Sequence, residues 1–230
     1  MDFRRYVSLG DSISIDVYPA EDARLRFPGR FTNSRLGAAS LLVRNDDRLW
    51  PEFRGRELRG VRHEDVTADG ATTHDLLVQA ARVTPSDDAT LITITAGGND
   101  LLAEIGGRGA SPAPAIASRL REAVARLFEL RPNSLMLIGT VYDPSDGTKR
   151  LPGFIGTLDR ESAWLDEYNA LVRELAQSDD RLRLADIHHH FLGHGLTAPE
   201  EERWYLRESI IEPSARGASE VRRLWLDAIG

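Results

Sequence analysis

Short apolar strands alternate with amphipathic helices along this chain, and this alternation narrows the choice of fold more than any other property of the sequence. The most regular strand is the β-branched segment TLITITA at 90–96, which is followed by two glycines. Further strands are predicted at 5–9, 58–66, 135–141 and 182–187, and helices at 34–49, 72–82, 113–130, 159–176 and 215–229. Strands and helices that alternate in this way pack as a parallel sheet with helices on both faces. We therefore expect a single three-layer α/β/α domain spanning residues 1–230.

The composition excludes several classes of protein. The 230 residues include no cysteine, so disulfides, thiolate metal sites and cysteine nucleophiles are ruled out. The formal charge of −7 argues against a nucleic-acid partner bound through general basicity. No apolar segment approaches the ~18–20 residues that a membrane span needs, and the N-terminus lacks a signal-peptide pattern. We expect a cytoplasmic, soluble protein, and the sequence does not indicate its oligomeric state.

Three loops at the carboxyl ends of predicted strands combine glycines with polar residues. The first loop holds Ser12, the second holds Gly70 and the third holds Asn99. Each loop taken alone is also explained as an ordinary turn whose polar residue caps the next helix. In a parallel sheet, however, such loops gather at one edge, which is where ligands bind. The side-chain amide of Asn99 is a neutral donor that can face a developing oxyanion.

Together the three loops resemble the SGNH hydrolases, also called the GDSL-type esterase and lipase family. The matching residues are Ser12 in YVSLGDS, Gly70 in DGATTHDLL and Asn99 in TAGGND. The resemblance implies a flavodoxin-like α/β/α sandwich with a parallel sheet of about five strands. It also implies a carboxylic ester hydrolase in which Ser12 forms an acyl-enzyme, while the Ser12 and Gly70 N–H groups and the Asn99 side chain hold the oxyanion. Such an enzyme uses no cofactor and no metal, and its partner is a small-molecule ester.

The catalytic base is the point at which the sequence departs from the family pattern. The family carries Asp-x-x-His-Pro shortly before its last helix, but here Glu212 stands at the histidine position and Ser209 at the aspartate position. A histidine run about twenty residues earlier offers a substitute. We predict that His194 or His189 activates Ser12, with Asp186 or Glu212 orienting the imidazole.

Other interpretations of these residues stay open. Glu212 is itself a candidate for a weak base, or the protein is a catalytically degenerate member that binds an acyl or carbohydrate ligand without turnover. The consecutive histidines at 188–190 also resemble a zinc site, but neighbours on an extended chain point to opposite faces and cannot all reach one ion. A phosphate-binding flavodoxin-like domain is a further alternative, although the chain has no GxGxxG or Walker-type spacing. The turn-rich segments 27–31 and 142–154 are expected to rim the substrate cleft.

Overall fold

A five-stranded parallel sheet organises the structure, a computed structural model that describes residues 2–26, 29 and 33–230. The strands are β1 (Arg5–Gly10), β2 (Arg62–Asp65), β3 (Thr90–Thr95), β4 (Ser134–Gly139) and β5 (Leu182–Ala185). Their spatial order is β2-β1-β3-β4-β5, and every neighbouring pair runs parallel. The carboxyl ends of β1 and β3 are therefore adjacent at the middle of the sheet, and the predicted fold class is confirmed.

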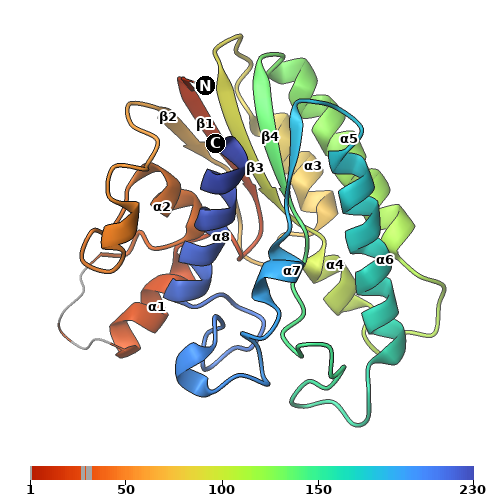
Figure 1. The fold of residues 1–230 in the computed structure, drawn as a ribbon. Coiled ribbons are helices and arrows are strands. Elements are labelled where there is room, and N and C mark those ends of the chain that lie inside the picture. The colour runs from red at the N-terminus through yellow and green to blue at the C-terminus, as the bar shows by residue number, and fades with distance from the viewer. Residues whose placement is uncertain (1, 27–28, 30–32) are drawn as a thin grey trace.

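Helices cover both faces of this sheet (Figure 1). One face carries α3 (Thr73–Arg82), α5 (Ala113–Leu130) and α6 (Asp159–Ala176), and the other carries α2 (Ala38–Val43) and α8 (Ala215–Ile229), with α1 (Val17–Arg26) beside α8. The short helices α4 (Gly98–Ala103) and α7 (Ile187–Phe191) directly follow β3 and β5, and 3-10 turns occupy Pro51–Phe53 and Glu200–Glu202. The architecture is thus a three-layer sandwich, and the loops that leave the carboxyl ends of the strands lie together at one end.

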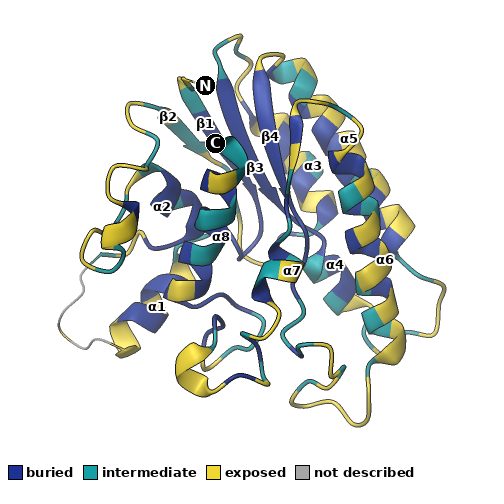
Figure 2. Ribbon diagram, in the orientation of Figure 1, coloured by how far each residue is buried: buried dark blue, intermediate teal, exposed yellow. Residues whose placement is uncertain are grey.

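Successive residues of a central strand pack into two separate apolar cores, one on each face of the sheet. In β1, Val7 and Leu9 pack against α3, α5 and α6, whereas Tyr6 packs in the core beneath α2 and α8. In β3, Ile92 and Leu91 divide between the two cores in the same way. All residues of β3 are buried (Figure 2), which explains why this strand reads as a continuous β-branched run and not as an apolar–polar alternation.

Most predicted elements are present, and the differences have local causes. The three helices predicted after residue 110 have the predicted ends. The helix predicted at 34–49 is wrong in length, because only α2 forms and a turn follows it. In that turn the Asn45 amide donates to the Trp50 carbonyl at 2.8 Å, and the Asp46 carboxylate accepts from the Arg48 N–H at 3.1 Å. Side-chain bonds of this kind compete with helix propagation. Neither α1 nor α4 was anticipated from the sequence pattern.

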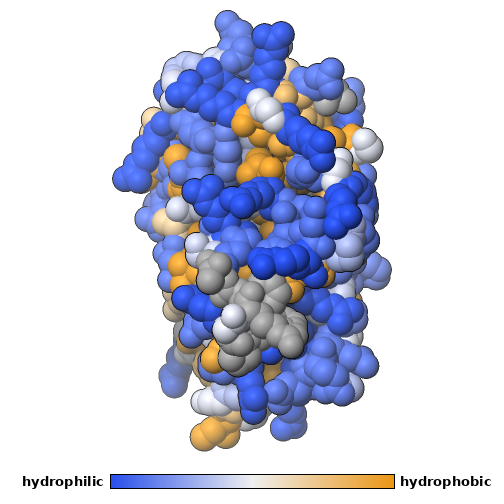
Figure 3. Space-filling view, turned by 90° about the vertical axis from the view of Figure 1, so that its left-hand side faces the viewer, coloured by the Kyte–Doolittle hydropathy of each residue, from blue (hydrophilic) through white to orange (hydrophobic). Residues whose placement is uncertain are grey.

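The sheet edge formed by β2 is short and polar. The strand predicted at 58–66 is limited to Arg62–Asp65, whose residues are exposed or half-buried. Charged residues on a short edge strand discourage pairing with another chain. Polar side chains also cover most of the surface on this side of the molecule (Figure 3). Within the described residues, no helix combines the length and the apolar character needed to cross a bilayer.

Candidate active site

Ser12 lies in the turn that leaves β1 at the carboxyl edge of the sheet. Gly10 has a φ of +123°, and a Cβ atom on it would overlap the Thr95 carbonyl oxygen, so only glycine fits. Gln79 of α3 holds the same residue from the other side. Its Oε1 accepts from the Gly10 N–H at 2.7 Å, and its Nε2 donates to the Gly10 carbonyl at 3.0 Å. These contacts fix the backbone that presents Ser12, which is 7% exposed and lines a pocket.

Asn99 reaches the same pocket from the first turn of α4. The next residue, Asp100, accepts from the Thr73 N–H at 2.8 Å and the Thr73 hydroxyl at 2.7 Å, which ties the start of α4 to the start of α3. The Asn99 amide donates to the Ala71 carbonyl at 3.0 Å and keeps its second hydrogen for another acceptor. Gly70 directly precedes Ala71, is exposed, and is not among the residues that line the pocket.

Glu212 enters the pocket from the segment before α8. The Tyr142 hydroxyl donates to the Ile211 carbonyl at 2.5 Å, and the Leu206 N–H donates to the Glu212 carbonyl at 2.8 Å. The residue is 8% exposed, and its Oε2 has no hydrogen-bond partner among the described residues. Burial raises the pKa of Glu212 to about 7, although the nearby Ser12 side chain lowers it in part. A carboxyl group with this pKa beside a serine hydroxyl suits general-base chemistry near neutral pH.

A second carboxyl group, that of Asp11, lies beside the first. Burial raises the pKa of Asp11 to about 7, against hydrogen bonds from the Ile13 N–H and the Thr95 side chain, and the charge of Glu212 raises it further. The Ile13 N–H lies 3.1 Å from Asp11 Oδ1. The charge of Glu212 thus disfavours ionisation of Asp11, and the charge of Asp69 disfavours ionisation of Glu212.

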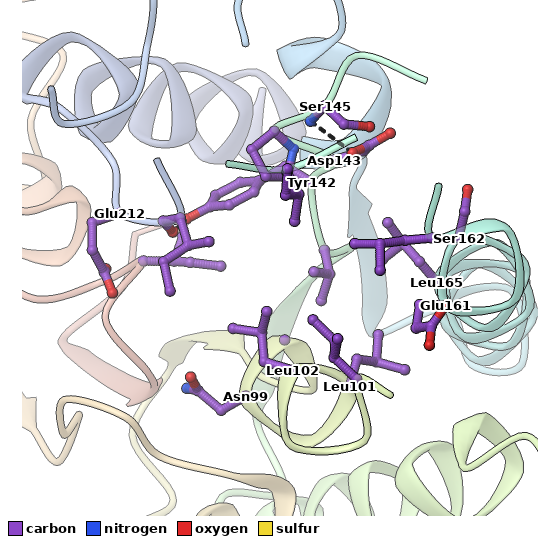
Figure 4. A pocket seen from close by; sticks show the side chains of 18 of the residues that line it. Asn99, Leu101, Leu102, Tyr142, Asp143, Ser145, Glu161, Ser162, Leu165 and Glu212 are labelled. Carbon is purple, nitrogen blue, oxygen red and sulfur yellow. Dashed lines mark hydrogen bonds between the residues drawn. The ribbon is translucent and has the colours of Figure 1, made fainter. Parts of the chain in front are cut away.

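The pocket is elongated and has a volume of about 120 Å³. Figure 4 shows Glu212 and Asn99 at one end, Leu101 and Leu102 of α4 along the floor, and the side of α6 at the other end. Residues from 142 to 151 form part of its lining, which confirms that this segment borders the cleft. The other segment expected there, 27–31, lies outside the described residues except for Gly29.

Comparison with known proteins decides the family. A sequence model of the GDSL-like lipase/acylhydrolase family matches residues 8–218. The chain belongs to this family. GDSL-like proteins of this family are carboxylic ester hydrolases, so the expected enzyme class is confirmed at that level. A comparison with curated proteins found no match.

Solved structures of similar fold cover nearly the whole of this GDSL-like chain. An extracellular lipase from Streptomyces rimosus has 21% identity and a TM-score of 0.64, with 97% of this chain and 99% of the other covered. A phospholipase A1 from Streptomyces albidoflavus has 19% identity and a TM-score of 0.63 over 98% and 99%. An acetyl xylan esterase from Geobacillus stearothermophilus has 18% identity and a TM-score of 0.66 over 99% and 94%. At these identities the likeness shows a shared fold.

The histidine run of this GDSL-like protein has other partners. The expectation that residues 188–190 are extended is wrong, because β5 ends at Ala185 and these residues form the helix α7. The His188 ring nitrogen Nδ1 lies 3.1 Å from the Val141 carbonyl, and His190 Nε2 lies 3.0 Å from a Glu220 carboxylate oxygen. In the part of the chain that the structure describes, no group of three His, Asp or Glu side chains is arranged to hold a metal ion.

The residues predicted as the base system lie outside the lining of the pocket that holds Ser12, and two of them have other contacts. His194 stacks on Trp204 with the ring centroids 3.7 Å apart, and Asp186 caps α7 by accepting from the His189 N–H at 3.3 Å. The Asp186 carboxylate also accepts from the guanidinium of Arg173 at 3.0 Å and 3.1 Å. None of these residues lines the pocket that holds Ser12.

Two residues that organise the site were not identified from the sequence. Gln79 lies on the buried face of α3, three residues after the core residue Leu76. A side-chain amide on an otherwise apolar helix face is the sequence feature that could have indicated its role. Tyr142 anchors the segment that carries Glu212, and no sequence pattern links two positions that are 69 residues apart.

Proposed function

We propose that this protein hydrolyses carboxylic esters through an acyl-enzyme on Ser12, with Glu212 as the catalytic base. The observation that supports the proposal is that Ser12 lines the same pocket as the buried Glu212, whose pKa burial raises to about 7. A serine hydroxyl is a weak nucleophile until a neighbouring base removes its proton. The Glu212 carboxylate performs that task when it is ionised, and it stands at the position where the family pattern places a histidine.

In the first step, Ser12 Oγ attacks the ester carbonyl carbon and its proton passes to Glu212. The carbonyl oxygen becomes an oxyanion, which faces the backbone N–H of Ser12 and the free amide hydrogen of Asn99. Among the described residues the Ser12 N–H has no acceptor, so it is available for this purpose. The Gly70 N–H also lacks an acceptor there, and it joins the oxyanion hole if the substrate reaches the adjoining turn.

In the second step, the intermediate collapses, the bond to the alcohol oxygen breaks, and protonated Glu212 returns its proton to that oxygen. A water molecule then takes the place of the alcohol. Glu212 removes a proton from the water as it attacks the acyl carbon, and it returns this proton to Ser12 Oγ when the carboxylic acid leaves. The cycle is balanced with one carboxyl group acting alternately as base and acid.

The histidine prediction is a competing assignment of the base, and mutation separates the two. We expect His194→Ala and His189→Ala to keep the ester hydrolysis rate within about twofold, because these rings lie outside the pocket. We expect Glu212→Gln to lower kcat by about 10²–10⁴, the contribution of a general base. If a histidine variant loses activity while Glu212→Gln retains it, the assignment of Glu212 is refuted.

The nucleophile is tested with a fluorophosphonate probe and a p-nitrophenyl ester. Ser12→Ala is expected to abolish both labelling and turnover. Ser162→Ala, a serine that lines the far part of the same pocket, is the matched control and is expected to retain both. If the folded wild-type protein is neither labelled nor active, the proposal fails and the alternative, a protein that binds an acyl or carbohydrate ligand without turnover, is favoured.

A cytoplasmic location stays a prediction.

A further inference from the structure

The pocket next to Ser12 is larger than an acetyl group requires, and most of its wall is apolar. It is lined by aliphatic side chains of α4, the turn after α4, α6 and the segment between β4 and α6, namely Leu101, Leu102, Ile105, Leu151, Leu158 and Leu165. One ordered water needs ~10–15 Å³ of such space, so about 120 Å³ accommodates roughly ten non-hydrogen atoms. An apolar cavity of this size gains free energy when a hydrocarbon chain displaces water from it.

The position of Glu212 decides which side of the ester fills this cavity. Glu212 must protonate the departing alcohol oxygen, so the alcohol lies at the Glu212 end of the pocket. Figure 4 shows that the leucines of α4 and α6 extend away from Glu212. The acyl chain therefore points toward α6, and it stays there while the alcohol is exchanged for water.

The charged side chains at the far end already have protein partners. Glu161 accepts from the Gly106 N–H at 3.2 Å, and Lys149 pairs with Asp159 at 3.1 Å. A substrate with a charged tail would have to displace these contacts. An alkyl chain that ends before these residues leaves the contacts intact. The far end thus sets a limit on chain length and provides no unpaired charge for a polar tail.

We propose that the site selects esters of unbranched fatty acids of medium length, about six to ten carbons. Leu102 and Leu165 line the part of the pocket that limits the length of the acyl chain. This inference rests on the proposed function, because it takes Ser12 as the attachment point of the acyl group. It adds a substrate class that excludes acetyl esters as the preferred substrates.

The test compares kcat/KM for p-nitrophenyl acetate, butyrate, octanoate and palmitate, which share one leaving group. Octanoate has six methylenes more than acetate, and each well-buried methylene is worth roughly a fourfold gain, so burial of only half of them already predicts a preference for octanoate of about 60-fold. Leu165→Trp and Leu102→Trp fill the cavity and are expected to remove this preference by lowering kcat/KM for octanoate far more than for acetate. Val78→Trp, on the exposed side of α3, is the matched control and is expected to keep the wild-type profile.

Binding gives a readout that does not depend on turnover. In Ser12→Ala protein, calorimetry is expected to detect octanamide but not acetamide, and Leu165→Trp is expected to abolish the octanamide signal. Three results would each overturn the acyl-chain assignment. These are a preference for acetate, tryptophan variants that slow the hydrolysis of every ester equally, and a higher kcat/KM for octyl acetate in place of octanoate esters. If no ester is hydrolysed but octanamide binds as described, the pocket assignment holds and the proposed function fails. If octanamide does not bind, the pocket assignment fails.

Discussion

Glu212→Gln is expected to stabilise the protein at pH 8 while it removes the catalytic base. In the native protein Glu212 is buried, and its Oε2 has no hydrogen-bond partner among the described residues. Ionisation of the carboxyl group therefore costs more in the folded state than in the unfolded chain. Glutamine keeps the shape of the side chain and carries no charge at any pH, so the variant avoids that cost.

The size of the effect follows from the pKa. Burial raises the pKa of Glu212 from 4.5 to about 7. The folded state thus keeps a proton that the unfolded state releases, and stability falls as pH rises from about 4.5 to 7. At about 1.4 kcal/mol for each pKa unit, this group costs the folded state up to about 3 kcal/mol above pH 7. Removal of the Glu212 charge also lowers the pKa of Asp11, which adds an effect of the same sign.

Urea unfolding at pH 5 and pH 8 measures this difference. The free energy of unfolding of Glu212→Gln is expected to exceed that of the wild type by less than about 1 kcal/mol near pH 5 and by about 3 kcal/mol at pH 8. Glu220→Gln is a matched control with the opposite sign. Burial raises the pKa of Glu220, but hydrogen bonds from His190 and Arg223 outweigh burial and lower it to about 2. Its charge stabilises the fold above pH 4.5, so Glu220→Gln is expected to be less stable than the wild type at pH 8.

The reasoning is refuted if Glu212→Gln has the same dependence of stability on pH as the wild type, or if it is destabilised at pH 8. Either result would mean that solvent reaches the carboxyl group and that its pKa is ordinary. A base with an ordinary pKa would be ionised but weak, and the case for Glu212 as the proton acceptor would lose its physical basis.

Three further predictions address the machinery around Ser12. The kcat/KM for a p-nitrophenyl ester is expected to rise with pH through an apparent pKa of about 7, that of Glu212, and a flat profile between pH 5 and 9 would contradict this. Asn99→Ala is expected to lower kcat by about 10²–10³ with an unchanged melting temperature, as measured by steady-state kinetics and calorimetry. Gln79→Leu leaves the buried Gly10 N–H without a partner, while the Gly10 carbonyl keeps its bond from the Ala68 N–H, so urea unfolding is expected to show a loss of about 1–3 kcal/mol together with a lower kcat; wild-type stability would show that this clamp is dispensable.

The sequence by itself determined the layers of the fold and placed two residues that line one pocket, Ser12 and Asn99. Three helices were predicted with their observed ends, at 113–130, 159–176 and 215–229. They could be predicted because the apolar residues that face the core recur in the sequence with the period of the α-helix. Ser12, Gly70 and Asn99 were predicted to share one hollow, because parallel strands bring the loops at their carboxyl ends together. Ser12 and Asn99 do line one pocket, whereas Gly70 is not among its lining residues. These inferences need only local pattern and the rules of chain connection.

The neighbour of Ser12 was decided by the tertiary structure alone. Residues 12 and 212 are separated by almost the whole chain, and their contact depends on how the segment before α8 folds against Tyr142. A histidine run near the end of β5 was an equally reasonable choice from spacing, but its rings found partners on Trp204, Glu220 and Val141 instead. The burial that raises the pKa of Glu212 is likewise a property of the packed molecule. Desolvation depends on all the atoms that surround a group in space, and neighbours in sequence are a small part of them.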